Sequence, residues 1–181
     1  MDRFVPPDRR VERVVRCTFG LFLFGLGIAL MLQGHVGAAP WDVFHTGVAR
    51  HIDVGVGTII VGTGAALLLL WIPLRERIGL GTVLNAILIG LFVDLTAPLL
   101  PDADALLPRV GLFAAGMVAI GVGSGFYIGS GLGPGPRDGL MTGLARLRIG
   151  GRDVTVGAAR TFIEASVLVL GALVPEGRRR R

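Results

Sequence analysis

Long runs of hydrophobic residues alternate with short polar segments along the chain. Five runs carry apolar side chains on every face instead of on one stripe, at residues 14–33, 54–74, 78–99, 110–128 and 154–174. Each is close to the roughly 20 residues that a helix rising about 1.5 Å per residue needs to cross a hydrocarbon core of about 30 Å. Helices that are apolar all round are typical of lipid surroundings. The pattern therefore predicts an all-α polytopic membrane protein with about five transmembrane helices.

Two of the polar segments repeat one another. Residues 37–50 read GAAPWDVFHTGVAR and residues 133–146 read GPGPRDGLMTGLAR, related by a shift of 96 positions. The same shift pairs three upstream glycines with three others: Gly20, Gly25 and Gly27 with Gly116, Gly121 and Gly123. Proline suits the first turn of a helix, whereas glycine weakens a helix interior. We therefore expect an internal duplication with a broken, re-entrant short helix in each half.

The duplication divides the chain into five parts. We expect a cytoplasmic tail at 1–13, a first membrane repeat at 14–99, a connector at 100–109, a second, incomplete repeat at 110–174 and a basic tail at 175–181. Three spans per half would place the halves upside down relative to each other, as in the inverted repeats of many secondary transporters. At a shift of 100, residues 53–57 resemble 153–157, which puts the counterpart of the third span where the sequence ends. Either a sixth element is missing or the last run does not fully cross.

Composition supports the membrane assignment and suggests an orientation. Hydrophobic residues make up 52% of the chain, the mean hydropathy is +0.70 and the formal net charge is +5. All 18 basic residues are arginines, clustered between apolar runs without interleaved aromatics, so we expect no nucleic-acid partner. If the spans alternate sides, most arginines outside the C-terminal tail share the face of the N-terminus. The positive-inside rule places that face in the cytoplasm.

Cysteine, histidine and tryptophan give no reason to expect a cofactor. Cys17 is the only cysteine, which excludes an intrachain disulfide and a cysteine-based zinc site. The three histidines lie in or beside the first repeated segment, at His35, His45 and His51. The second segment has no histidine, so we expect no metal site. Trp41 and Trp71 are expected at the membrane interfaces, where tryptophan commonly anchors a helix.

Arg160 and Glu164 form the strongest charged pattern within an apolar run. They are four residues apart, so they share one face of the fifth span. A single charge near the membrane midplane costs roughly 2.5–3.5 kcal/mol on insertion scales, and a neutralising partner reduces that cost. Two interpretations stay open: a functional charge pair inside the bundle, or a structural ion pair that ties the fifth span to its neighbours.

The repeated aspartates and threonines form a second group of candidates. Asp42 and Asp138 each follow a helix-starting proline by two positions, and Thr46 and Thr142 lie about one turn later. If the two helix starts face each other, they can bind a small polar solute or ion, and the carboxylates favour a cation or a zwitterion. Alternatively, each aspartate only caps its own helix. Asn85, a polar residue near the middle of the third span, is a further candidate.

Three stretches carry a resemblance to a known family: GAAPWDVFHTG at 37–47, GLGTVLNAILIG at 79–90 and GLGPGPRDGLMTGLAR at 131–146. They resemble the YczE/YitT-like family of bacterial integral membrane proteins, and the similarity extends over most of the chain, including Arg160 and Glu164. The resemblance implies a multi-pass helical protein of the bacterial plasma membrane. It supplies no reaction and no catalytic residues.

These observations favour a transporter-like membrane protein with a small-solute or ion site between its two repeats. The expected site residues are Asp42, Thr46, Asn85, Asp138, Thr142, Arg160 and Glu164. A non-transporting scaffold or accessory subunit is the alternative, because an incomplete second repeat could need a partner. No nucleophile–base set is visible, so we do not expect an enzyme. The partners that we expect are the lipid bilayer, a small solute and, in a homo-oligomer, a second copy of the chain.

Overall fold

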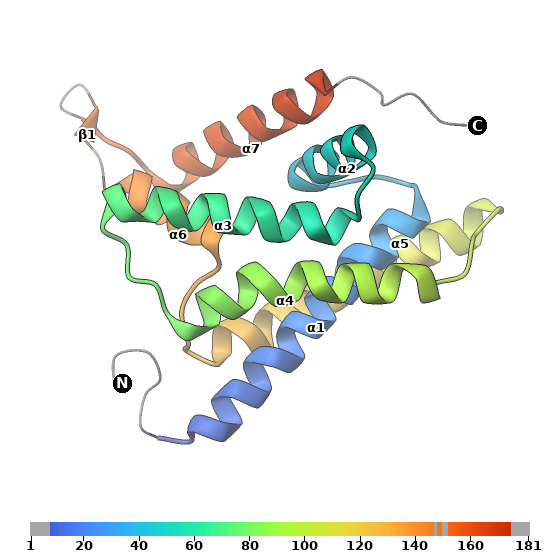
Figure 1. The fold of residues 1–181 in the computed structure, drawn as a ribbon, viewed down its shortest axis with the longest axis horizontal. Helices are drawn as coiled ribbons and strands as arrows, with labels where there is room; N and C mark the ends of the chain where they lie inside the picture. The colour runs from blue at the N-terminus through green and yellow to red at the C-terminus, as the bar shows by residue number, and fades with distance from the viewer. Residues whose placement is uncertain (1–7, 147, 150–151, 175–181) are drawn as a thin grey trace.

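The computed structural model describes residues 8–146, 148–149 and 152–174, and this part of the chain is almost wholly helical (Figure 1). The five long helices are α1 (Arg10–Gly34), α3 (Val56–Leu74), α4 (Leu80–Thr96), α5 (Leu106–Gly129) and α7 (Val156–Leu173). Two short helices lie between them, α2 (Pro40–Ile52) and α6 (Pro136–Ala145). A 3₁₀ turn, η1 (Ala97–Leu99), extends α4, and two-residue strands form a hairpin before α7, β1 (Arg148–Ile149) and β2 (Arg152–Asp153).

The long helices coincide with the five predicted spans. Each is long and apolar enough to cross a bilayer, with α4 and η1 counted together. Two helices begin four residues before the expected starts at 14 and 110, since α1 begins at Arg10 and α5 at Leu106. The prediction of an all-α polytopic membrane protein with two interrupted short-helix segments is confirmed. The expected basic tail at 175–181 lies outside the described residues, as does most of the N-terminal tail.

α1 and α5 cross in antiparallel fashion through glycine. A Cβ added at Gly20 would lie 2.6 Å from the carbonyl oxygen of Gly123, and one added at Gly27 would lie 2.7 Å from that of Gly116. Only glycine permits backbones to approach so closely, which is a common way for membrane helices to pack. At the shift of 96, Gly20 corresponds to Gly116 and Gly27 to Gly123. The two contacts are therefore the same contact seen from opposite halves.

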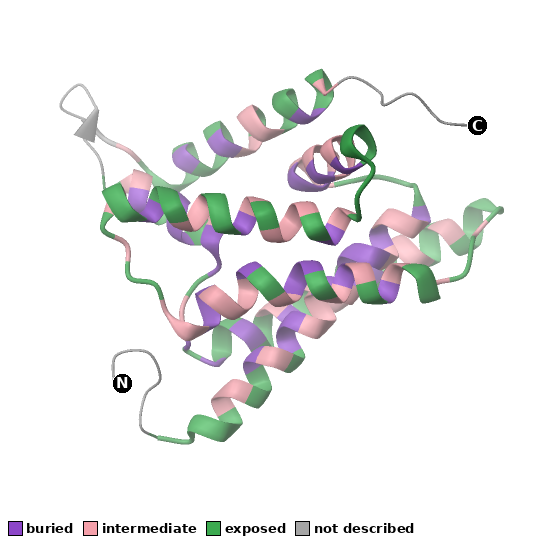
Figure 2. Cartoon of the chain, in the orientation of Figure 1, coloured by how far each residue is buried: buried purple, intermediate pink, exposed green. Residues whose placement is uncertain are grey.

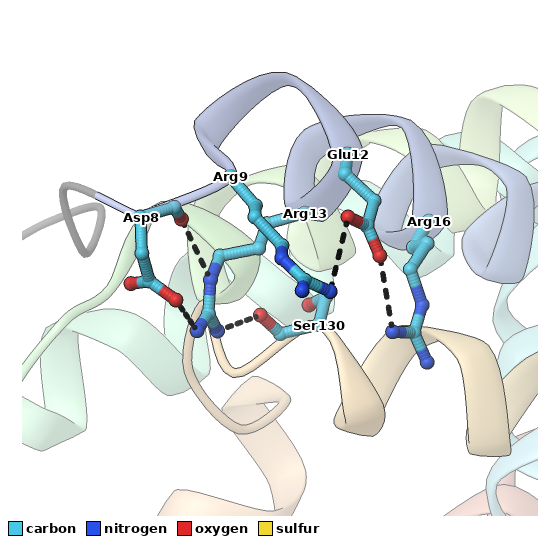
Figure 3. A network of polar contacts seen from close by, with 6 residues as sticks. All are labelled: Asp8, Arg9, Glu12, Arg13, Arg16 and Ser130. Carbon is cyan, nitrogen blue, oxygen red and sulfur yellow. Dashed lines mark hydrogen bonds and ion pairs between the residues drawn. The ribbon is translucent and has the colours of Figure 1, made fainter.

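A matched pair of arginines ties the ends of α1 and α5 together. Arg13, near the start of α1, donates to the carbonyl oxygen of Ser130 after α5 at 2.9 Å (Figure 3). Arg109, near the start of α5, donates to the carbonyl oxygen of Gly34 at the end of α1, also at 2.9 Å. Arg13 and Arg109 correspond at the shift of 96, and so do Gly34 and Ser130. Each arginine thus satisfies a terminal carbonyl of the opposite helix, where positive charge is favourable.

The start of α1 carries further ion pairs at the same end of the molecule. Arg13 also contacts the carboxylate of Asp8 at 2.8 Å, and Glu12 lies 3.7 Å from both Arg9 and Arg16 (Figure 3). The hydrogen bond from Arg13 is the largest cause that lowers the pKa of the exposed Asp8 carboxyl. These charges precede the fully apolar part of α1, so they are placed to lie at a membrane surface.

α4 completes the first half by packing against α1 and α3. Gly25 of α1 faces the backbone of α4, Gly57 of α3 meets the main chain of Gly90, and Gly64 of α3 meets Ala86. α3 and α4 run antiparallel through these contacts. The small residues let three helices approach closely, so α4 lies in a groove between α1 and α3 that glycine creates.

Asp94 adds hydrogen bonds to the contact between α4 and α3. Its carboxylate accepts hydrogen bonds from the backbone N–H of Gly57 at 2.7 Å and from the hydroxyl of Thr58 at 3.1 Å. The first N–H groups of a helix have no partner within the helix, and they favour negative charge. Asp94 therefore caps α3 from a neighbouring helix.

The short helices pack across the two halves. α2 lies against α7, and α6 lies against α3 and α7. The ring of Trp71 in α3 covers Gly139 of α6, and its indole N–H donates to the carbonyl of Pro136 at 2.9 Å. At the other crossing, Gly171 of α7 faces the backbone of Phe44 in α2. A glycine therefore permits the close approach at both crossings.

The tryptophans do not lie where the sequence suggested. Trp71 is 1% exposed and Trp41 is 7% exposed. Trp41 packs in an apolar cluster with Leu140, Met141 and Ile163, which joins α2 to α6 and α7. The prediction that these tryptophans anchor the helices at membrane interfaces is wrong, because their rings fill contacts between short and long helices.

Large apolar side chains cover much of the outer surface. Figure 2 shows exposed residues along α3 and α7 and buried ones where helices meet, and α5 also carries many exposed residues. Leu107, Ile72 and Phe162 are among the most exposed of these side chains. A surface of this kind suits hydrocarbon, so the burial pattern agrees with the five spans.

Candidate functional site

α2 begins after a sharp change in backbone direction at the end of α1. His35 has a positive φ of 48°, and Pro40 then opens α2. Asp42 in the first turn accepts a hydrogen bond from the backbone N–H of Ala39, at 3.4 Å from Oδ2. The carboxylate is 6% exposed and lies where the helix favours negative charge.

α6 begins in the same way after a glycine-rich turn. Gly131 and Gly133 have φ values of 68° and 118°, a region that residues with side chains rarely adopt. Pro136 opens the helix, and Asp138 follows in its first turn. The hydroxyl of Tyr127 donates to the carbonyl of Gly133 at 3.0 Å, which holds the turn against the end of α5.

The two helix starts share one partly open cavity of about 340 Å³. Asp42 of α2 and Asp138 of α6 both line it, and Asn85 of α4 lines it as well. Three of the expected site residues, from three different helices, are thus brought to one place. His45 and Tyr127 contribute further polar groups to a wall that is otherwise mostly apolar.

Arg137 brings positive charge to the same cavity. Burial raises the pKa of Asp42, which lies on α2 outside the five spans, while the hydrogen bond from Ala39 and the charge of Arg137 oppose that rise. Burial and the charge of Arg137 lower the pKa of His45 to about 4, so its imidazole is neutral at neutral pH. The cavity therefore combines two carboxyl groups, one guanidinium group and a neutral histidine.

Three buried polar atoms at the cavity wall have no hydrogen-bond partner among the described residues. They are Nε1 of Trp41 and both ring nitrogens of His45. The His45 ring also lies beside the rings of Trp41 and Phe44. A buried polar group left unpaired costs about 1–3 kcal/mol. The three atoms have almost no accessible surface, so a molecule in the cavity would pair with them only if the rings turned toward it.

Arg137, His45 and Tyr127 are cavity residues that the sequence did not single out as solute contacts. Arg137 lies inside the repeated segment, at the position of Trp41, and Tyr127 is the only tyrosine of the chain. The signal that could have found Arg137 is its place between Pro136 and Asp138, which forces it into the same first turn.

Thr46 and Thr142 turn their hydroxyls to their own helices. Thr46 donates to the carbonyl of Asp42 at 2.6 Å, and Thr142 donates to that of Gly139 at 3.0 Å. Neither residue lines the central cavity. Thr46 instead borders a second, more open cavity of about 810 Å³ between α1, α2, α3 and α4, which Arg50 and Asp94 also line.

Arg160 and Glu164 form the expected ion pair, with Arg160 Nε 3.0 Å from a carboxylate oxygen of Glu164. The side chains are 62% and 27% exposed, and neither lines the central cavity. The pair therefore lies on an outer side of α7, apart from Asp42 and Asp138. The ion pair forms as the four-residue spacing in the sequence predicted. It does not lie at the central cavity with Asp42, Asn85 and Asp138.

The central cavity suits reversible binding through charge and hydrogen bonds. Within the described residues, no three histidine, cysteine, aspartate or glutamate side chains gather as a metal-ligand group. Two helix starts that present carboxylates, together with an amide and a neutral imidazole, can surround a small polar molecule from several sides.

Comparison with known proteins places the chain in a family. Residues 11–175 match the model described as a family of unknown function (DUF6198). An uncharacterized protein from Haemophilus influenzae is 35% identical over 158 residues, which are 86% of this chain and 70% of that protein. The uncharacterized membrane protein YczE from Bacillus subtilis is 38% identical over 138 residues, which are 72% of this chain and 63% of YczE, just under two thirds.

The Bacillus subtilis protein YyaS, also uncharacterized, is 27% identical over 158 residues, which are 85% of this chain and 77% of YyaS. No solved structure matches. The similarity to YczE confirms the resemblance that the repeated motifs suggested. With five apolar helices and these relatives, the chain is a YczE-like, multi-pass membrane protein and belongs to the DUF6198 family.

Proposed function

We propose that the protein binds a small cationic or zwitterionic solute in its central cavity and carries it across the membrane. The observation that carries this proposal is the convergence of Asp42 and Asp138, from repeated segments 96 positions apart, on one cavity. The volume of about 340 Å³ is at the small end of ligand cavities, which fits a small solute.

The charge of the cavity selects the class of solute. When Asp42 and Asp138 are ionised, Arg137 balances one of the two negative charges, and His45 adds none. One negative charge is then left over for a ligand. A cation neutralises it directly, and a zwitterion can pair its cationic group with a carboxylate and its anionic group with Arg137.

The pairing of the halves supports movement as well as binding. The reciprocal contacts of α1 with α5 and the two interrupted helix starts are what an inverted repeat would produce. In many secondary transporters such repeats hold the substrate between discontinuous helices, and one repeat rocks against the other. We extend the proposal to the orientation: the protein lies in the plasma membrane with its N-terminus in the cytoplasm.

Uptake into proteoliposomes tests the proposal. A panel of labelled small amines, amino acids and monovalent cations is offered to vesicles with and without the protein. We expect saturable uptake of at least one member, and a loss of at least about tenfold in Asp42→Asn and in Asp138→Asn, because each removes a carboxylate from the cavity. Asp102→Asn is the matched control, since Asp102 is exposed and hydrogen-bonds Gln33 at 2.7 Å, away from the cavity.

Uptake equal to that of empty vesicles over the whole panel would contradict transport. Binding without uptake would favour a non-transporting scaffold or accessory subunit that only senses the solute. The proposal assigns no catalysis to the cavity, so the solute should be recovered chemically unchanged from the vesicles.

A further inference from the structure

The positions on which α4 packs in the first half have counterparts in the second half. The shift of 96 pairs α1 with α5, and the shift of 100 pairs the start of α3 with the start of α7. Gly121 of α5 therefore corresponds to Gly25, and Gly157 of α7 corresponds to Gly57. In the first half, Gly25 and Gly57 are both buried because α4 lies on them.

The corresponding glycines of the second half are open. A Cβ added at Gly121 or at Gly157 would meet nothing within 4 Å, and the same holds for Gly125, the counterpart of the buried Ala29. At Gly57, by contrast, an added Cβ would run into the carbonyl of Gly90 on α4. The same close-packing positions are thus used in one half and left uncovered in the other, among the residues that the structure describes.

The start of α7 also lacks the cap that α4 gives to α3. Asp94 of α4 binds the backbone N–H of Gly57 at 2.7 Å, whereas the described residues offer the first turn of α7 only the hydroxyl of Thr155, which binds the N–H of Ala158 at 3.1 Å. Exposed N–H groups at a helix start favour a carboxylate. A helix in the second groove would complement this end if it carried an acid where α4 carries Asp94.

The ion pair of α7 lies on the same side. Glu164 corresponds to Gly64, which packs against Ala86 of α4, and Arg160 corresponds to Ile60. A charged pair that faces hydrocarbon is costly, and cover by a further helix lowers that cost. By correspondence with the first half, the open glycines, the helix start that has no carboxylate cap among the described residues and the exposed pair belong to one surface. It is formed by Gly121, Gly125, Gly157, Arg160 and Glu164, and we term it the second groove.

We propose that the second groove binds one further transmembrane helix of α4 type, from outside residues 1–181. Its face would carry glycine or alanine where it crosses Gly157, and a carboxylate one turn later, as Gly90 and Asp94 do in α4. A second copy of the chain is a poorer occupant, because each copy has one α4 and that helix already fills the first groove. Binding of a helix in the second groove follows from the repeat and does not depend on solute transport, so one proposal can fail while the other holds.

A peptide with the sequence of residues 79–99, which covers α4 and η1, is the probe. The protein carries a donor dye at Val154→Cys in a Cys17→Ala background, next to the start of α7, and is reconstituted in liposomes. The peptide carries an acceptor dye at its C-terminal end. We expect saturable energy transfer, since the end of the helix that follows Asp94 would lie beside the start of α7. The first groove does not compete, because its own α4 is linked to it covalently.

Substitutions on both sides locate the contact. Gly157→Leu in the protein and Gly90→Leu in the peptide should each weaken binding by about tenfold, because leucine blocks the close crossing. Gly62→Leu is the matched control: Gly62 is also open, but it lies on α3 away from the second groove, and the variant should bind normally. Thermal melting should show that the parent protein, Gly157→Leu and Gly62→Leu are equally folded, since a Cβ added at Gly62 or Gly157 would meet nothing within 4 Å.

Three results would overturn the proposal. Energy transfer no greater than with a scrambled peptide, or transfer that Gly157→Leu leaves unchanged, would show that the groove does not hold such a helix. Energy transfer between two labelled copies of the protein that is lost in Gly121→Leu and insensitive to added peptide would show that a second copy covers the groove instead.

Discussion

α2 and α6 share a motif but use it differently. Both open with proline and place an aspartate in the first turn, and both aspartates reach the central cavity. The residue between the proline and the aspartate differs, although it lines the cavity in both helices. Trp41 in α2 also joins the apolar cluster with α6 and α7, whereas Arg137 in α6 brings a positive charge that shifts the pKa of Asp42 and of His45. The path of the backbone is repeated, and the chemistry around the cavity is not.

The helix crossings of α2 and α6 also differ in their contacts. α6 places Gly139 under the large ring of Trp71 in α3, while α2 brings its own backbone at Phe44 against Gly171 of α7. A glycine permits the close approach in both cases, but it lies on the short helix in one and on the long helix in the other. A duplicated pair of helices can therefore diverge in side chains as long as each crossing keeps one small partner.

The largest effect is expected from filling one of these crossings. Gly139→Leu places a side chain where the ring of Trp71 lies, so we expect a loss of about 1–3 kcal/mol in unfolding free energy or a failure to fold. Thermal unfolding in detergent, followed by size-exclusion chromatography, measures this. Gly62→Leu is the control, because Gly62 has no neighbour within 4 Å. Equal stability of the two variants would show that the crossing tolerates a second large residue.

An intermediate effect is expected at the position where α2 and α6 differ most. Arg137→Gln removes the positive charge of the cavity, so we expect a monovalent cation to bind roughly tenfold more tightly. Isothermal titration at several pH values measures this, with Arg50→Gln as control, since Arg50 lines the other cavity. Unchanged affinity would mean that Arg137 points its charge elsewhere when the solute binds.

The same titration series gives the sign of the pH dependence. Binding of a cation needs the ionised form of Asp42, whose pKa burial raises and Arg137 partly restores. Affinity should therefore fall as the pH falls through that raised pKa, and in Arg137→Gln the fall should begin at a higher pH. A fall that begins at a lower pH in the variant would contradict the assigned contact between the two charges.

The smallest effect is expected from substituting the threonines that occupy equivalent positions in α2 and α6. Thr46→Val and Thr142→Val each remove a hydroxyl that binds a carbonyl of its own helix, so we expect changes within about 0.5 kcal/mol in stability and no change in solute binding. Thermal unfolding measures the stability, and isothermal titration measures the solute binding. A tenfold loss of binding in either variant would show that its hydroxyl turns to the solute.

The sequence predicted the spans and their interruptions because lipid imposes a simple pattern on them. Runs of about 20 apolar residues and prolines after glycines are local signals, and α1 to α7 follow them closely. The meeting of Asp42 and Asp138 could also be anticipated, since a shift of 96 gives the two helix starts equivalent places, whereas Asn85 stood out only as a polar residue near the middle of a span.

The remaining features depend on contacts that no local pattern reveals. The burial of Trp71 requires a glycine 68 positions away, and the role of Arg137 depends on which way a single side chain leaves the first turn of α6. The spacing of Arg160 and Glu164 gave their ion pair but not its place, because helix periodicity defines a shared face and not the neighbour of that face.

The arginines at the ends of α1 and α5 limit how the molecule can move. Arg13 holds the carbonyl of Ser130, and Arg109 holds that of Gly34, at opposite ends of the same pair of helices. Sliding one helix past the other by a single turn would break both hydrogen bonds at once and drive the glycine contacts between them out of register. The contact between α1 and α5 is therefore the most constrained interface between the two repeats, and a rocking of one repeat against the other would pivot at this contact without sliding along it.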